Sequence, residues 1–150
     1  MTSIRCAILT IAATSTAFLC GCTTVNVRAL QDAQSIKEVY IIENPKVAVD
    51  DFLEVLTSDF ENHGIGVRVG SEEGAPGHGY VVRYVAYRKW DLKPYMTDAS
   101  IDVSKDGLHI AHADYHLVNG GGLDLGKFAG THSKIDPIID QLLGGEAAKN

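Results

Sequence analysis

Cysteine is missing from most of this chain of 150 residues. The three cysteines, Cys6, Cys20 and Cys22, all lie near the start, and none follows residue 22. A disulfide framework and a cysteine-based zinc site each need several thiols, so the sequence excludes both from the part that follows. Catalysis by a thiol is excluded there for the same reason.

An excess of positive charge is also missing. The chain has 13 Lys and Arg residues against 19 Asp and Glu residues, and its net charge is −6. Such a surface repels phosphate backbones and anionic lipid headgroups, so we expect no nucleic-acid partner and no electrostatic membrane binding. The length, with a hydrophobic content of 45%, fits one globular domain and hardly two.

No apolar run is long enough to cross a bilayer. A transmembrane helix needs about 20 apolar residues, whereas the run at residues 6–19 is shorter and is interrupted by threonine and serine. Arg5 precedes this run and small residues follow it, which is the order of parts in a secretory signal peptide. The sequence therefore predicts a signal peptide over residues 1–21.

The residues that end this segment, Leu19, Cys20, Gly21 and Cys22, resemble the bacterial lipobox. In that motif, leucine stands three positions before the modified cysteine, and glycine or alanine stands directly before it. The resemblance implies that Cys22 begins the mature protein and carries acyl chains such as palmitate, which anchor it at about 0.8 kcal/mol per buried CH₂. Thr23, in place of aspartate, implies sorting to the outer membrane. The alternative is an ordinary signal peptide cut nearby, with Cys22 left as a free thiol.

Residues 22–34 are polar and show little apolar periodicity, so we expect the lipid anchor to be followed by a flexible tether. A single folded domain is expected over residues 35–150. Its first strand covers residues 37–42 and is rich in β-branched residues. An amphipathic helix follows between Pro45, which suits a first helical position, and Gly64, which suits the residue after the end.

Alternating apolar and polar residues predict the remaining strands. These cover residues 80–90, 97–103 and 108–117, with a short apolar strand at 65–69 before them. Asp106 and Gly107 supply a hairpin turn. A last helix within 131–143 is expected to begin close to Pro137, with Asp136 or Ser133 as alternative caps. The order β-α-β-β-β-β-α predicts an α+β two-layer sandwich, with a mainly antiparallel sheet of about four strands and two helices on one face.

Several segments between Trp90 and Leu143 resemble a family of small proteobacterial lipoproteins. They are Trp90-Asp91, Tyr95-Met96, Ala99-Ser100-Ile101-Asp102, the turn Asp106-Gly107, and the run Ser133-Lys134-Ile135-Asp136-Pro137-Ile138-Ile139-Asp140-Gln141-Leu142-Leu143. The resemblance implies a lipid-anchored domain that faces the periplasm. It implies no catalytic residue, because none is defined for that family.

The histidine-rich strand at 108–117 holds the best candidate for a binding site. Side chains two residues apart on a strand project to one face about 6.6 Å apart, so His112, Asp114 and His116 share a face. Two imidazoles and a carboxylate bind zinc when a fourth ligand closes the site. The alternative is the solvated face of a one-sided antiparallel sheet, which also requires outward polar residues.

Trp90 and Tyr95 lie where two predicted strands are joined. Aromatic residues at such a sheet edge form partner-binding surfaces. They also close the end of a core, since one part of each ring is apolar and another is polar. The sequence leaves both alternatives open.

These features together predict a non-enzymatic, lipid-anchored envelope protein, on the inner leaflet of the outer membrane and facing the periplasm. We expect it to bind, or to help assemble, another envelope protein. No nucleophile elbow or paired acid and base stands out, and no cofactor is expected besides the lipid on Cys22. The alternative is a periplasmic domain that binds a metal or a small ligand through His112, Asp114 and His116.

Overall fold

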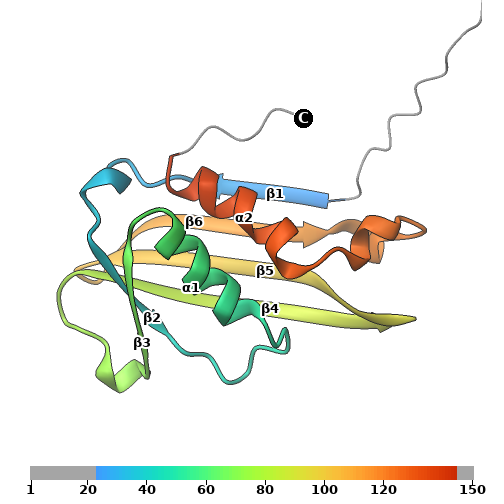
Figure 1. Ribbon diagram of the computed structural model, residues 1–150, viewed down its shortest axis with the longest axis horizontal. Helices are drawn as coiled ribbons and strands as arrows, with labels where there is room; N and C mark the ends of the chain where they lie inside the picture. The colour runs from blue at the N-terminus through green and yellow to red at the C-terminus, as the bar shows by residue number, and fades with distance from the viewer. Residues whose placement is uncertain (1–22, 145–150) are drawn as a thin grey trace, which may run out of the picture.

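The computed structural model describes residues 23–144, so the predicted signal peptide and Cys22 lie outside the described residues. One layer is a six-stranded sheet, and both helices lie on the same face of it (Figure 1). The strands are β1 (Thr23–Arg28), β2 (Glu38–Ile42), β3 (Gly66–Gly70), β4 (Tyr80–Asp91), β5 (Lys93–Lys105) and β6 (Leu108–Leu117), and the helices are α1 (Phe52–Asn62) and α2 (Thr131–Leu142). Short 3₁₀ turns are η1 (Ala33–Ser35), η2 (Glu72–Gly74), η3 (Val118–Gly121) and η4 (Leu125–Phe128). The α+β class is confirmed.

The sheet is mixed and has more strands than predicted. Its order is β1-β6-β5-β4-β2-β3, and β2 runs parallel to both β3 and β4 while the other neighbours are antiparallel. The prediction of about four mainly antiparallel strands is therefore wrong on strand number and on direction. The physical reason is that α1 crosses one face between β2 and β3, and such a crossover returns the chain in the same direction. Residues 39–42 of β2 are all buried, as expected for a strand covered on both faces.

The first strand replaces the tether predicted for residues 22–34. β1 pairs with β6 along its whole length, from Thr23 opposite Leu117 to Arg28 opposite His112. β1 is an edge strand whose residues are mostly exposed, and Val27 packs against the core. An edge strand with one wet face needs few apolar residues, so its sequence does not stand out from a polar linker.

The core lies between the helices and the sheet. α1 buries Phe52, Val55, Leu56 and Phe60, and α2 buries isoleucines and Leu142 against the inner face of the strands. Both helices were expected, but their starts differ from the predicted ones. α1 begins at Phe52 rather than Pro45, because the Asn44 side chain is held in a turn: it donates to the Tyr84 carbonyl and accepts from the Lys46 N–H.

Helix α2 begins six residues before Pro137, so the expectation that it begins close to this proline is wrong. Pro137 cannot donate a backbone hydrogen bond, which weakens a helix interior. Ile135, Ile138 and Ile139 on both sides of it are fully or almost fully buried. Their burial at about 1.5–3 kcal/mol each offsets the lost hydrogen bond.

Candidate functional site

The sheet face opposite the helices is largely exposed over β1, β6, β5 and the part of β4 that follows Val81, and we call this region the open face. Because side chains alternate along each strand, outward residues line up in rows across the strands. From β1 to β4, the three rows are Thr24, His116, Asp98 and Tyr87; Asn26, Asp114, Ser100 and Val85; and Arg28, His112, Asp102 and Arg83. Acids and imidazoles are therefore direct neighbours across β5 and β6.

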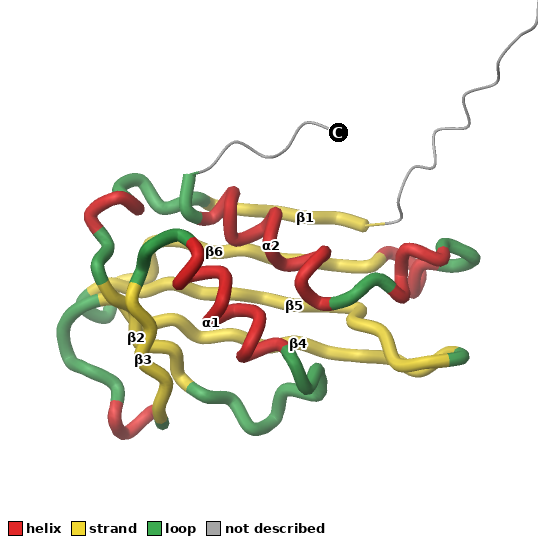
Figure 2. Tube along the Cα trace, viewed as in Figure 1, coloured by secondary structure: helices red, strands yellow, loops and turns green. Residues whose placement is uncertain are grey.

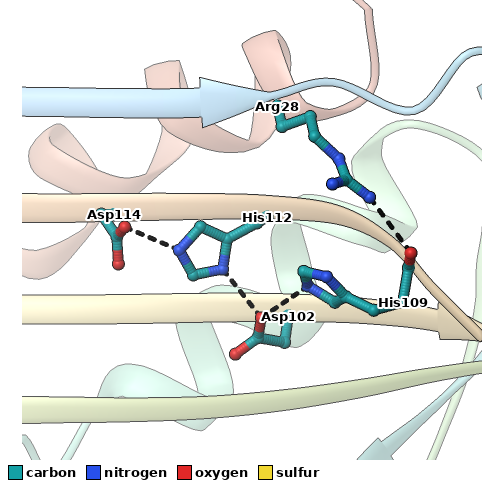
Figure 3. A network of polar contacts seen from close by, with 5 residues as sticks. All are labelled: Arg28, Asp102, His109, His112 and Asp114. Atoms are coloured by element: carbon teal, nitrogen blue, oxygen red, sulfur yellow. Dashed lines mark hydrogen bonds and ion pairs between the residues drawn. The ribbon is translucent and has the colours of Figure 1, made fainter.

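His112 lies at the centre of a polar network on this face (Figure 3). Its Nδ1 lies 2.7 Å from Asp102 Oδ1, and its Nε2 lies 2.6 Å from Asp114 Oδ2. Since ionised carboxylates only accept hydrogen bonds, both ring nitrogens must donate, which makes the ring an imidazolium. Burial lowers the pKa of His112, but the hydrogen bonds and charges of Asp102 and Asp114 outweigh burial and raise the pKa above its ordinary value.

His109 joins the same network from the start of β6. Its Nε2 lies 2.7 Å from Asp102 Oδ1, and its backbone carbonyl accepts from the Arg28 guanidinium at 3.1 Å. In a regular strand His109 and His112 would project to opposite faces. A register shift lies between Val103 and Ser104, and it places His109 opposite Ser104 and thus on the open face. Bulges re-aim side chains in this way.

The structure brings only part of the predicted metal ligand set together. His112 and Asp114 are in contact, but His116 Nδ1 pairs with Asp98 Oδ1 at 2.5 Å, in a different row. Burial raises the pKa of Asp98, but hydrogen bonds from His116 and Thr97 and the charges of His116 and Lys89 outweigh burial and lower the pKa below its ordinary value. The set of His112, Asp114 and His116 is therefore not a common metal site in the folded chain.

A different set is close enough to hold an ion. The ligand atoms of Asp102, His109 and His112 all lie within 4.8 Å of one another. Imidazole nitrogen and carboxylate oxygen are ligands that zinc accepts, with water able to fill a fourth position. Bound metal would have to replace the proton that His112 shares with its carboxylates, so metal and proton compete for the site.

A second ionisable cluster lies between the helices. Asp59 of α1 is 3% exposed, and its Oδ2 has no hydrogen-bond partner among the residues that the structure describes. His132 Nδ1 lies 3.1 Å from Asp136 Oδ1 on α2, and 3.9 Å from Asp59 Oδ1. Burial, followed by the charge of Asp136, raises the pKa of Asp59 to about 7. Asp59 therefore holds its proton far above the usual range of a carboxyl.

The two aromatic residues predicted to bind a partner have different surroundings. Trp90 is exposed near the turn between β4 and β5, whereas Tyr95 is partly buried and packs edge-on against Phe128 of η4, with ring centres 5.7 Å apart. Lys127, which is buried, places its Nζ over both the Tyr95 and the Phe128 ring. Tyr95 thus belongs to the packing of the domain, and Trp90 alone is free to meet a partner.

Neither helix within residues 23–144 has the length and apolar character that spanning a membrane requires. The chain matches no protein-family model and no curated protein. It is similar to a solved PelC dodecamer from Paraburkholderia phytofirmans, with 16% identity and a TM-score of 0.53 over 80% of this chain and 96% of that chain. A variant of the same dodecamer gives 15% identity and a TM-score of 0.50 over 85% and 99% of the two chains. At this identity the similarity shows the fold alone.

Proposed function

We propose that this chain is a lipid-anchored protein of the bacterial outer membrane, facing the periplasm, that acts without catalysis as an assembly module. The lipobox-like residues Leu19 to Cys22 support the anchor. β1 begins at Thr23, which directly follows Cys22 and pairs with Leu117, so lipid on Cys22 would be attached directly to a strand of the sheet. With no tether in between, acyl chains on Cys22 would hold the sheet itself close to the bilayer.

The observation that carries the assembly role is the open face. Antiparallel sheets commonly leave one face to water, but this one also exposes Val85 and Tyr87 beside the paired charges. Around them lies a shallow hollow of about 370 Å³, bordered by Thr24, Asn26, Asp98 and His116 among others. A surface of apolar side chains bordered by ordered polar groups is typical of protein interfaces.

The similar PelC chains are solved as dodecamers. This supports the proposal that copies of the present chain associate with one another, since the fold is similar over most of both chains. Sequence identity of 15–16% transfers neither the number of copies nor the contact residues. We therefore propose self-association through the open face, and leave the number of copies to measurement.

Native mass spectrometry of the detergent-extracted protein, together with thiol labelling, tests this function. Lipid would occupy the sulfur of Cys22, so Ser100→Cys places a single free thiol on the open face, and Glu61→Cys places one on the exposed side of α1 as a control. We expect a species of several copies. Because Ser100 is partly buried within one chain and Glu61 is exposed, the effect of dilution on each rate is compared, and we expect dilution to speed the labelling of Ser100→Cys several-fold more than that of Glu61→Cys. A monomer at every concentration would contradict self-association, and an equal effect of dilution at both positions would move the interface away from the open face.

Metal binding is the second candidate function, and the convergence of Asp102, His109 and His112 is the observation that favours it. Titration calorimetry with zinc ions at pH about 8, where the His112 proton competes less, measures it directly. We expect His112→Gln to abolish binding and His116→Gln, in the neighbouring row, to leave it unchanged. Equal zinc affinity in the two variants would refute a site at this position.

A further inference from the structure

The most exposed large apolar side chains gather at one end of the sheet. Trp90 is 75% exposed, Leu92 82%, Leu123 100% and Leu125 79%. The first two lie at the turn between β4 and β5, and the other two lie in the loop that contains η3 and η4. We call these four residues the apolar end. Large apolar residues that are so fully exposed contribute little to the core, and a group of them indicates a surface that binds a protein or a membrane.

Two contacts of a buried lysine hold the two halves of the apolar end together. Lys127 Nζ donates to Asp91 Oδ2 at 2.8 Å and to the Gly122 carbonyl at 2.8 Å. Asp91 lies between Trp90 and Leu92, and Gly122 directly precedes Leu123. The packing of Tyr95 on Phe128 adds a second link between the β4–β5 hairpin and the η4 loop. The exposed side chains are thus carried on an ordered support.

The backbone at Leu92 is unfavourable for leucine. Its φ is 52°, which lies in the left-handed region that glycine and asparagine adopt readily and that is strained for leucine. Since the side chain is also exposed, folding gains little from a leucine at this turn. A strained residue that the fold does not need indicates a role in binding.

The apolar end is the end at which β1 begins. Thr23 pairs with Leu117, the last residue of β6, and η3 starts directly after it. Figure 2 shows the start of β1, the β4–β5 turn and the loop of η3 and η4 at the same end of the sheet. Leu108, which is also well exposed, lies at the opposite end, where β5 turns into β6.

We propose that the apolar end docks onto the bilayer that holds the lipid of Cys22, with Trp90, Leu92, Leu123 and Leu125 in the headgroup and upper acyl region. The inference rests on the proposed lipid anchor. That anchor would place a bilayer next to Thr23, and tryptophan is enriched at the headgroup level of membranes. The exposed Lys89 and Lys93 flank Asp91 in the sequence, so the β4–β5 turn has no excess of negative charge that would repel a lipid surface.

Trp90 is the only tryptophan of the chain, so its fluorescence reports the depth of this end directly. The lipidated full-length mature protein is reconstituted into phosphatidylcholine vesicles, with or without lipid brominated near the top of the acyl chains. We expect the Trp90 emission to shift to the blue and to be quenched by the brominated lipid. The control is Leu108→Trp in a Trp90→Phe background, which moves the tryptophan to the opposite end of the sheet. We expect the quenching of this tryptophan to be at most about half that of Trp90.

Vesicle flotation distinguishes a failure of the lipid anchor from a failure of the apolar end to dock. Protein that floats and shows equal quenching at positions 90 and 108 keeps its anchor, but overturns the docking of the apolar end. Trp90 that is shielded from acrylamide in water, yet not quenched by brominated lipid, is covered by another protein surface and likewise overturns it. Protein that does not float lacks the anchor, and the docking inference falls with the proposed function.

Discussion

Replacement of Asp59 by asparagine is expected to stabilise the protein at neutral and alkaline pH. Asp59 is buried between α1 and α2, and no Lys or Arg is among the groups that shift its pKa. The ionisable groups that do so are Asp136, His132 and His63. An ionised carboxylate in this position is poorly solvated and is repelled by Asp136. Asparagine has nearly the shape of the protonated acid and no charge, so the Asp59→Asn variant lacks this unfavourable ionisation.

The size of the effect follows from proton linkage. A carboxyl with a higher pKa in the folded than in the unfolded state binds its proton more tightly when folded, so the wild type loses stability as pH rises from about 4 to about 7. The pKa of Asp59 rises from 3.8 to about 7. About 3 units at about 1.4 kcal/mol each give a loss on the order of 4 kcal/mol above pH 7. The variant is expected to retain this stability.

Urea denaturation of both proteins at pH about 5 and about 8 measures the free energy of unfolding. We expect the advantage of Asp59→Asn to grow by about 2–3 kcal/mol between these pH values. Glu61→Gln is the matched control, since Glu61 is exposed on the same helix, and its difference from wild type should not change with pH in this way. A variant less stable than wild type at pH about 8 would show instead that ionised Asp59 is stabilised in the fold.

Three further variants test other contacts. Because the pKa of His112 is raised in the fold, its stabilising contribution is fully present below its unfolded pKa of about 6.5 and is lost as pH rises through the folded pKa. In urea denaturation, His112→Gln should therefore lower the free energy of unfolding more at pH about 5.5 than at pH about 9. An equal loss at both pH values would contradict the ion pairs. Leu92→Asn should raise the free energy of unfolding by up to about 1 kcal/mol in thermal denaturation, because asparagine tolerates the positive φ. A clear decrease in the free energy of unfolding would show that Leu92 packs in the fold. Lys127→Met should lower the free energy of unfolding by about 1–3 kcal/mol in urea denaturation, because it leaves the Gly122 carbonyl and Asp91 without their shared donor. An unchanged midpoint would show that water replaces the lysine Nζ as the donor.

The sequence predicts the elements whose apolar periodicity is strong. The faces of α1 and α2 and the long strands β4, β5 and β6 were expected close to where they lie, because deep burial on one side leaves a clear pattern. The edge strand β1 lies where the sequence predicts a tether, since exposed Thr and Asn residues outnumber its apolar residues. Strand directions depend on which strands meet in space, and no local pattern records that.

The candidate site was predicted in part for a similar reason. The period of a strand places His112 and Asp114 on one face, and the structure brings them together. Asp102 and His109 were missed because they come from the neighbouring strand and from beyond a bulge. The hairpin turn at Asp106 and Gly107 was the available signal: counting outward from it pairs Ser104 with His109 and places both on the face of Asp102.

The proposed function depends on lipid at Cys22, which would hold this domain directly at a membrane. Intact mass spectrometry of protein extracted from the membrane fraction, beside a Cys22→Ser variant, tests it most directly. We expect the mass of residues 22–150 plus acyl chains, and we expect the Cys22→Ser variant to lack that added mass and to leave the membrane fraction. A mature protein whose mass shows no acyl chains would contradict the lipid anchor.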